Sequence, residues 1–213
     1  MGVVLTGGAS RRMGATKALI EIDGVAMASL VAAALRDAGC CNVLASGGDP
    51  DELAPLGLPV LADRYPGSGP LGGVLGVLEL FEAHEPRPGG VFVVACDLPA
   101  LTGADLDALV KGARDQPGVD VVVARTSSIE PTCAIWRLSA IERIRRCFED
   151  GDRAMHAMIE RLDSHEVDID PAALRNINTP EELGRYPRRC DISGNLSSGP
   201  RGARIGSTHR RCS

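Results

Sequence analysis

The residues with the most suggestive chemistry lie near the start of the chain, in residues 5–17, LTGGASRRMGATK. This segment follows a short apolar run and contains three glycines, two arginines and one lysine. Glycine allows the backbone to come close to another group. Backbone amides at Gly7 and Gly8, together with the charges of Arg12 and Lys17, would therefore suit phosphate oxygens. A glycine pair beside cations is also common in ordinary exposed turns, so the segment alone leaves both interpretations open.

The spacing of these residues excludes two familiar nucleotide-binding motifs. Two residues separate Gly14 from Lys17, so the GK[ST] of a Walker A motif is missing. The segment also lacks the G-x-G-x-x-G of dinucleotide-binding folds, and no acid ends a strand about 20 residues further on. What remains is a glycine-rich, cationic loop directly after the first predicted strand.

Two further loops carry similar chemistry. Asp97 follows the apolar run VFVVAC at residues 91–96, where a carboxylate could hold Mg²⁺ beside a triphosphate. A helix-capping aspartate in a strand–helix turn would give the same pattern. A second glycine-rich stretch, PGSGPLGG at residues 66–73, follows Asp63 and another short strand. If these strands are parallel, all three loops lie at the edge of the sheet where ligands bind in open α/β folds.

Short apolar runs alternate with helical patterns in the first part of the chain. Strands are predicted at residues 3–6, 42–46, 58–62, 91–96 and 119–124, and helices at residues 27–39, 71–84 and 102–115. Gly39 is expected to end the first helix and Thr102 to cap the third. The nearly continuous apolar strands favour a parallel sheet covered on both faces. The predicted fold class is α/β, a Rossmann-like three-layer α/β/α sandwich with a mainly parallel central sheet.

The pattern changes after about residue 126. A strand is predicted at residues 131–136, helices at 138–151 and 152–162, and another strand at 165–169. The stretch NINTPEEL has the pattern of a capped helix, with Thr179 as N-cap, Pro180 after it and Glu182 three residues on. Residues 1–186 are thus expected to form one folded domain. Residues 187–213 are rich in Gly, Ser and Arg without an apolar period, and are expected to be a disordered basic tail.

Composition argues against several classes of protein. The chain has 213 residues and a formal net charge of −5, and because the tail holds six arginines and one acid, the excess of acid belongs to residues 1–186. A body that acidic is a poor match for nucleic acid. No apolar run of about 18 residues and no signal-peptide pattern is visible, and the cysteines and histidines lack zinc-site spacing. A cytoplasmic monomer that binds neither nucleic acid nor membrane is expected.

The motifs together resemble those of a known family. The opening VVLTGGASRRMGATKALIEIDG is similar to the signature of the molybdenum cofactor guanylyltransferases, which belong to the nucleotidyltransferases with a single Rossmann-like domain. DRYPGSGPLGG, CDLP, EPTCAIW, GDRAM and NINTPEEL follow in the family's order, so the resemblance covers residues 2–186. The first signature is shared with relatives that transfer cytidylyl or sugar-linked nucleotides, whereas the ordered set is more specific.

The resemblance implies roles for particular residues. The residues expected at GTP are Leu5, Thr6, Gly7, Gly8, Lys17, Ser46, Asp63 and Asp97. Those expected to be catalytic are Lys17, Arg12 and Asp97, with Arg11 beside them and Asp97 as the metal ligand. Those expected on the molybdopterin side are Asn176, Asn178 and Arg153. Ser46 stands where the family often has Asn.

Two positions depart from the family's pattern. Ala154 replaces the second arginine of the GERR-like segment, which bears on the pterin-phosphate site, and Ala26 replaces a proline after the Asp-Gly turn. Trp136, the only tryptophan, is expected in the core on the side of the second substrate.

The activity that the resemblance implies is guanylyl transfer. The terminal phosphate of molybdopterin, with or without Mo, would attack the α-phosphate of GTP and expel pyrophosphate. Mg²⁺ on Asp97, with Lys17 and Arg12, would offset the repulsion between two anions and hold an in-line geometry. A phosphate monoester is already an anionic nucleophile, so no Ser–His-type activation and no covalent intermediate are expected. A molybdenum-insertion protein and apo-molybdoenzymes are further partners that the resemblance suggests.

Two alternatives remain open. The chain could transfer CMP to molybdopterin, or a nucleotide to another small phosphate, although Gly7-Gly8 resembles the guanylyl branch and the cytidylyl branch tends to have an alanine in this pair. It could also be a non-catalytic GTP-binding adaptor that delivers cofactor, against which the presence of both Asp97 and Lys17 argues.

Overall fold

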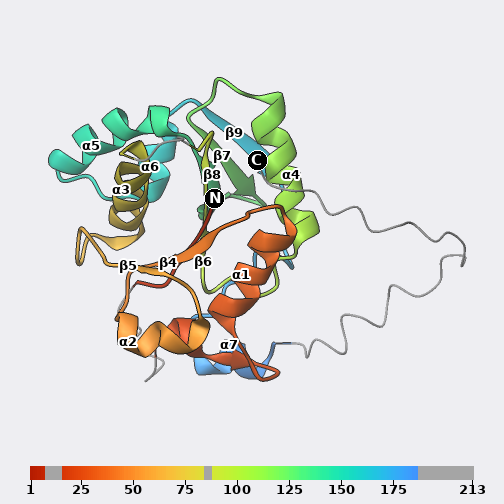
Figure 1. The fold of residues 1–213 in the computed structure, drawn as a ribbon. Coiled ribbons are helices and arrows are strands. Elements are labelled where there is room, and N and C mark those ends of the chain that lie inside the picture. The colour runs from red at the N-terminus through yellow and green to blue at the C-terminus, as the bar shows by residue number, and fades with distance from the viewer. Residues whose placement is uncertain (8–15, 84–87, 187–213) are drawn as a thin grey trace, which may run out of the picture.

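A seven-stranded sheet runs through the molecule between two layers of helices (Figure 1). The strand order is β5-β4-β1-β6-β8-β7-β9. The strands are β1 (Gly2–Leu5), β4 (Val43–Ser46), β5 (Val60–Leu61), β6 (Val91–Ala95), β7 (Val121–Arg125), β8 (Ile129–Trp136) and β9 (Ser164–Asp168). Only β8 runs against its neighbours β6 and β7, and the other pairs in this sheet are parallel. The predicted mainly parallel α/β/α sandwich is therefore confirmed.

The structure is a computed structural model and describes residues 1–7, 16–83 and 88–186. The sequence predictions for Gly8, Arg11 and Arg12, and for the tail at 187–213, lie outside the described residues. Within the described part of the chain, no helix is long and apolar enough to cross a membrane.

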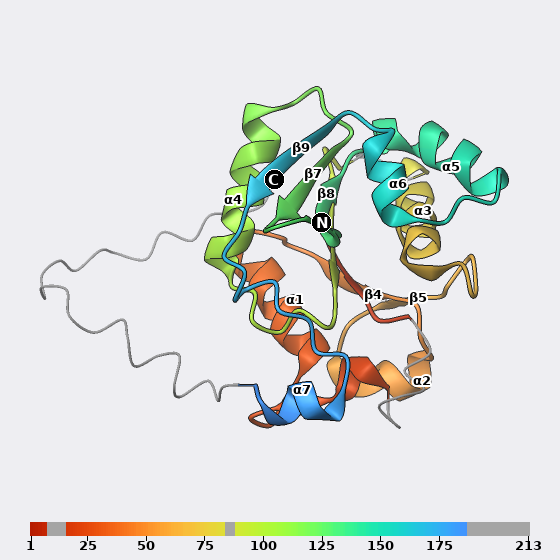
Figure 2. The same ribbon diagram turned by 180° about the vertical axis from the view of Figure 1, so that it is seen from behind.

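The two helical layers cover opposite faces of the sheet, as a view from behind also shows (Figure 2). On one face lie α1 (Met27–Asp37) and α4 (Gly103–Asp115), and on the other lie α3 (Gly69–Glu82), α5 (Ile141–Glu149) and α6 (Met155–Glu160). Successive strand side chains point to opposite faces. In β1, Val4 therefore joins the core beneath α1 and α4, whereas Val3 and Leu5 join the core beneath the other three helices.

The predicted helix ends are confirmed where the signal is local. Gly39 adopts a φ of 88° after α1, and its N–H donates to the Arg36 carbonyl. Thr102 caps α4 in a capping box with Asp105, and Thr179 caps α7 (Pro180–Gly184) in the same way with Glu182. The predicted helix at 71–84 starts two residues earlier, at Gly69, and ends at Glu82; Ser68 is in the N-cap position without a capping hydrogen bond from its side chain.

Several short elements were not predicted. The strands β2 (Glu21–Ile22) and β3 (Val25–Ala26) form a hairpin whose turn residues, Asp23 and Gly24, both have positive φ. This is the conformation that Asp-Gly favours in a two-residue hairpin turn. The other short helices are η1 (Lys17–Leu19), α2 (Pro50–Leu53), η2 (Ala54–Leu56) and η3 (Leu138–Ala140).

Trp136 is fully buried, as expected, but its predicted location is wrong. It pairs with Val91 and Val121, the first residues of β6 and β7. Because β8 is antiparallel to both strands, its last residue lies at the edge of the sheet opposite to the carboxyl ends of the others. The direction of a strand is a long-range property that the local pattern EPTCAIW does not reveal.

Candidate active site

The predicted site residues gather where the order of the strands reverses. From β1 the chain passes through α1 to β4 and β5 on one side, and then through α3 to β6 on the other side of β1. In open α/β sheets this switch point, outside the carboxyl ends of the strands, is where ligands bind. Gly7 follows β1 there and Asp97 follows β6, so the predicted convergence of these loops is confirmed.

Three of the predicted residues meet directly at this point. The Lys17 Nζ lies 2.5 Å from Asp97 Oδ2 and 2.6 Å from Asn178 Oδ1. The Lys17 and Asp97 side chains retain 17% and 19% of their exposure, so this ion pair is largely shielded from solvent. Lys17 and Asn178 are 161 residues apart in the chain. The first glycine-rich loop and the NINTPEEL stretch thus contribute to one site.

A small apolar cluster holds these distant segments together. Ile22 and Met27, from the hairpin and the start of α1, pack with Ile177. The Ile177 N–H also donates to the Asp97 carbonyl at 3.0 Å. In both views the blue helix α7 lies against the start of α1, at the lower end of the molecule (Figure 1; Figure 2). Packing around Ile177 therefore positions the residues on either side of it.

Asp97 has the environment of a ligand-binding carboxylate. It does not cap a helix, because Thr102 caps α4 and the Asp97 Oδ2 accepts from Lys17. Its Oδ1 is buried and has no hydrogen-bond partner among the described residues. Buried carboxylate oxygens are costly without a partner. Carboxylate and amide oxygens are the donors that Mg²⁺ takes, commonly one or two from protein with the rest from water and substrate phosphates, so Asp97 and Asn178 fit a divalent cation.

The loop after β1 is fastened to the loop after β4. The Thr6 N–H and Gly7 N–H both donate to the Ser46 carbonyl, and the Thr6 hydroxyl donates to the Gly47 carbonyl at 2.6 Å. A Cβ at Gly47 would lie 2.8 Å from the Gly7 Cα, so the two backbones touch. The Gly7 amide, which the sequence suggested for phosphate, is therefore engaged within the protein. Thr6, Ser46 and Leu5 are all buried. In this structure these residues shape the floor of the site.

Asp63 follows β5, three strands away from Asp97 in the sheet. At the usual spacing of neighbouring strands this corresponds to roughly 14 Å. Asp63 is exposed, and its Oδ1 accepts from the Tyr65 N–H at 2.9 Å. Its carboxylate therefore shapes the turn that leads into α3.

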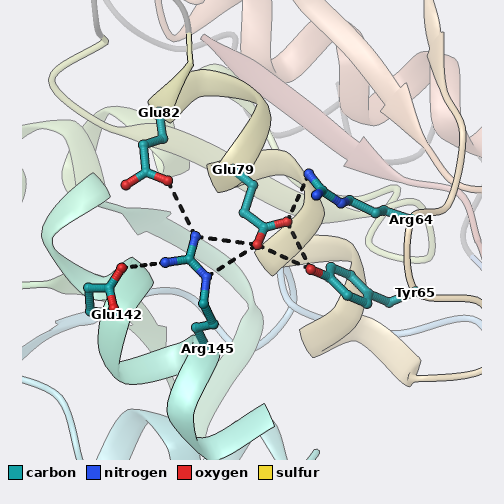
Figure 3. A network of polar contacts seen from close by, with 6 residues as sticks. All are labelled: Arg64, Tyr65, Glu79, Glu82, Glu142 and Arg145. Atoms are coloured by element: carbon teal, nitrogen blue, oxygen red, sulfur yellow. Dashed lines mark hydrogen bonds and ion pairs between the residues drawn. The ribbon is translucent and has the colours of Figure 1, made fainter. Parts of the chain in front are cut away.

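A polar network braces this turn against α3 and α5 (Figure 3). The nearly buried Glu79 accepts from the Tyr65 hydroxyl at 2.9 Å and pairs with Arg64 at 3.1 Å. Arg145, on α5, points toward Glu79 and also contacts Glu82 and Glu142 (Figure 3). Burial and the Glu79 carboxylate raise the pKa of Tyr65 above its usual value, which keeps the phenol protonated as a donor. The sequence analysis did not single out any of these residues.

Arg153 lies on the far side of the same turn. Its guanidinium carbon is 3.8 Å from the centroid of the Phe148 ring, and Phe148 in turn contacts the Tyr65 ring at 4.8 Å. One guanidinium nitrogen also donates to the Phe148 carbonyl at 2.9 Å. Arg153 is exposed, so the aromatic stack orients a cation that solvent and ligands can reach. Arg153 is therefore beside the turn after Asp63, and in the described part of the chain it forms no hydrogen bond or ion pair with Asn176 or Asn178.

The start of β8 contributes residues that the sequence analysis missed. Because β8 is antiparallel, its first residues reach the site edge beside the loop of Asp97. Glu130 Oε1 accepts from the Thr132 hydroxyl at 2.6 Å, and Glu130 Oε2 is 3.5 Å from the Asn176 Nδ2. Asn176 Oδ1 is buried and unpartnered among the described residues. The only sequence signal for Glu130 was its place in EPTCAIW.

Cys96, the residue before Asp97, is expected to be unreactive. Burial, reinforced by the Asp97 charge, raises the pKa of Cys96 to about 12. Burial likewise raises the pKa of Cys133, which lies on β8. A thiol with so high a pKa is almost entirely protonated near neutral pH, so neither cysteine is a nucleophile here.

Comparisons with known proteins agree with this geometry. The model of a family described as a MobA-like NTP transferase domain matches residues 2–167. A molybdenum cofactor guanylyltransferase of Mesorhizobium japonicum is 34% identical over 196 residues, which cover 88% of this chain and 94% of that protein. A second, from Rhodobacter capsulatus, is 32% identical over 200 residues and covers 88% and 95%.

Solved structures share the fold. The molybdopterin-guanine dinucleotide biosynthesis protein A of Archaeoglobus fulgidus has a TM-score of 0.69 and 25% identity over 87% of this chain and 96% of its own. A Mycobacterium tuberculosis protein in complex with manganese has a TM-score of 0.65 and 17% identity, with coverage of 86% and 95%. The second likeness concerns the fold alone. Because the family model and the first relatives span most of the sequence, the chain belongs to the MobA-like NTP transferase family, as one of its molybdenum cofactor guanylyltransferases.

Proposed function

We propose that this protein transfers GMP from GTP to the terminal phosphate of molybdopterin, with or without bound molybdenum, and releases pyrophosphate. The observation that carries the proposal is the meeting of Lys17 and Asp97 at the switch point of the sheet. The chain's relatives are named molybdenum cofactor guanylyltransferases, which supports the choice of both substrates.

GTP is proposed to lie across the carboxyl ends of β5, β4 and β1. Its phosphates would then lie at Lys17 and Asp97, and its guanosine would reach toward Asp63. The separation of roughly 14 Å estimated from strand spacing suits an extended nucleotide. Gly7 and Gly47, where the two loops touch, have no side chains, which allows the triphosphate to come close to the backbone there. The proposed contributions of Gly8, Arg11 and Arg12 come from the sequence alone.

A divalent cation is proposed at Asp97, with Mg²⁺ as the physiological ion. The Asp97 carboxylate and the Asn178 amide oxygen are the groups that would hold it. When bound, the ion supplies positive charge that offsets the charge of the triphosphate. A Mycobacterium tuberculosis protein of the same fold has been solved in complex with manganese, so a divalent cation is compatible with this fold.

The second substrate is proposed to approach from the other side of Asp97. Asn176 lies beside Glu130 at the start of β8, and its buried Oδ1 is a hydrogen-bond acceptor with no protein partner among the described residues. The resemblance also suggests Arg153 for a pterin phosphate, without a second arginine at Ala154, but its stacking on Phe148 places it beside the turn after Asp63 and away from Asn176.

In the proposed reaction the residues of this site supply charge and orient the substrates, and they do not need to transfer protons. A phosphate monoester is already an anionic nucleophile, so the main barrier is to bring two anions together in line. The Lys17 ammonium reduces that repulsion, and its burial strengthens the effect. The thiols of Cys96 and Cys133 are protonated, so neither of them competes with the substrate phosphate as a nucleophile.

The deciding experiment is a pyrophosphate-release assay with purified protein, Mg²⁺ and molybdopterin. Release with GTP, dependent on molybdopterin, is the expected result. Release with CTP in place of GTP would favour the cytidylyl alternative. GTP binding without release in the presence of molybdopterin would favour the non-catalytic adaptor, and an Asp97→Asn variant serves as the background control.

The cellular setting is also part of the proposal. We propose that the protein is a cytoplasmic monomer. It would receive its pterin from a molybdenum-insertion protein and pass the product to apo-molybdoenzymes. Size-exclusion chromatography with light scattering tests the monomer.

A further inference from the structure

Lys17 occupies a position that a metal ion would also favour. Its Nζ is in contact with two oxygens from different segments, Asp97 Oδ2 at 2.5 Å and Asn178 Oδ1 at 2.6 Å. A carboxylate oxygen and an amide oxygen that converge on one point form a site for a cation, whether that cation is an ammonium or a divalent metal.

The other carboxylate oxygen does not offer a second route. Asp97 Oδ1 is buried to the point of having no contact with solvent, so an incoming ion must approach through Oδ2. That approach is the one that Lys17 covers. An ammonium and a divalent cation on the same oxygen would repel each other strongly in this shielded position.

The backbone that carries the two oxygens is held in place, whereas the ammonium is able to move. The Asp97 carbonyl accepts from the Ile177 N–H, and the Asn178 N–H donates to Glu182 at 2.6 Å, so the backbone holds both residues. The ammonium stands at the end of a flexible four-carbon chain with three donors. A phosphate group that reaches the site can therefore draw Lys17 away without moving the backbone that carries the two oxygens.

We propose that the Lys17 ammonium and the divalent cation compete for Asp97 and Asn178, and that the nucleoside triphosphate ends this competition by taking Lys17 onto its phosphates. Metal and nucleotide then bind together, and metal alone binds weakly. Asn178 becomes an oxygen ligand of the cation, not a contact of the pterin. This inference rests on the proposed function, because it needs a triphosphate and a metal at this site.

The test measures Mn²⁺ binding to the full chain by electron paramagnetic resonance of the free ion, without nucleotide. Lys17→Met removes the charge but keeps most of the length. It should tighten Mn²⁺ binding by roughly ten- to hundred-fold, the value of one hydrogen bond to a charged group. The chain has one other lysine, the exposed Lys111, and Lys111→Met is the matched control for the change in net charge. An affinity in Lys17→Met that equals or falls below that of the wild type would overturn the inference.

Two further arms separate this inference from the proposed function. Asn178→Ala, added to Lys17→Met, should reverse most of the gain; retention of the full gain would remove Asn178 from the cation site and overturn that part. With GTP present, wild-type Mn²⁺ affinity should rise by a larger factor than that of Lys17→Met, because only the wild type must release its own cation. Asp97→Asn should abolish Mn²⁺ binding with GTP. If it does not, the metal assignment of the proposed function fails, whatever the result for Lys17.

Discussion

Two aspartates lie at opposite ends of the strands, one at the amino ends and one at the carboxyl ends of the parallel strands, and they have different surroundings. Asp120, just before β7, is buried, and its carboxylate accepts from the Ser139 hydroxyl, from Arg143 at 2.6 Å and from the Asp163 N–H. Asp97, just after β6, has one oxygen on Lys17 and the other unpartnered among the described residues. A carboxylate held by several fixed donors stabilises the fold, whereas one held only by the ammonium of a flexible lysine can exchange that partner for a ligand.

The largest expected effect is on catalysis, from Asp97→Asn. The change removes the charge but keeps the shape, so guanylyl transfer should fall by about two orders of magnitude or more, as when an essential electrostatic group is removed. The thermal midpoint should change little, because no bond that Asp97 makes through its backbone is lost. Initial rates of pyrophosphate release over a Mg²⁺ titration check this. Near-normal turnover at low Mg²⁺ would remove Asp97 from the metal site.

Asp120→Asn should have the opposite effect. It weakens a buried carboxylate with several donors, so the free energy of unfolding should fall by about 1–3 kcal/mol. Turnover per folded molecule should stay close to the wild-type value. Urea unfolding followed by the fluorescence of Trp136, which pairs with Val121 beside Asp120, measures the loss. A large drop in kcat with unchanged stability would show that Asp120 acts in catalysis and not in stabilising the fold, contrary to its contrast with Asp97.

The two asparagines of the NINTP stretch should differ from each other. Asn178 contacts Lys17, so Asn178→Ala should weaken the binding of metal together with GTP, by about tenfold for a hydrogen bond worth 1.4 kcal/mol. Asn176 faces Glu130, so Asn176→Ala should raise the KM for molybdopterin and leave GTP binding near normal. Calorimetric titration of GTP with Mg²⁺ and KM values for both substrates separate the two roles. Equal losses for both substrates in both variants would mean that the segment acts as one unit.

Tyr65→Phe should have a modest effect. It removes the hydroxyl that donates to Glu79, whereas Arg64 and Arg145 remain to pair with that carboxylate. The free energy of unfolding should fall by about 1 kcal/mol, the usual net value of one hydrogen bond. Because the turn after Asp63 loses a brace, the KM for GTP should rise slightly. A loss of unfolding free energy larger than that of Asp120→Asn would show that this network contributes more to stability than its partly exposed residues suggest.

The smallest expected effect is on the thiol of Cys96. Its pKa is raised to about 12, so the reactive thiolate is scarce at every pH up to that value and increases only as the pH approaches it. Iodoacetamide at pH 8 should therefore leave Cys96 unmodified in the folded protein, and mass spectrometry of its peptide measures this. Modification of Cys96 at a rate comparable to that in the urea-unfolded chain would show that the site opens readily.

The sequence predicted best those features that local chemistry determines. The caps Thr102 and Thr179 and the position of Asp97 after a buried strand depend on a few neighbouring residues, and all three are confirmed. The Asp-Gly turn between β2 and β3 also carried a local signal, although the hairpin was not predicted.

What the sequence could not predict depends on long-range packing. The direction of β8 moved Trp136 to the opposite edge and brought Glu130 to the site. The contact of Lys17 with Asn178 requires the apolar cluster around Ile177, whose members come from both ends of the domain. The engagement of the Gly7 amide with Ser46 depends on the close approach of two loops, which no spacing in the sequence reports.

The contact between Lys17 and Asn178, which joins the two ends of the domain, has a consequence for how the protein is synthesised. A ribosome makes Lys17 among the first residues and Asn178 161 residues later, at about 5–20 residues per second. While β1, β4 and β6 are able to pair as they emerge, the two sides of the cation site meet only when residues 176–186 have left the exit tunnel. Nascent chains therefore cannot form the contact between Lys17 and Asn178, and the proposed cation site is complete only after the domain has been translated.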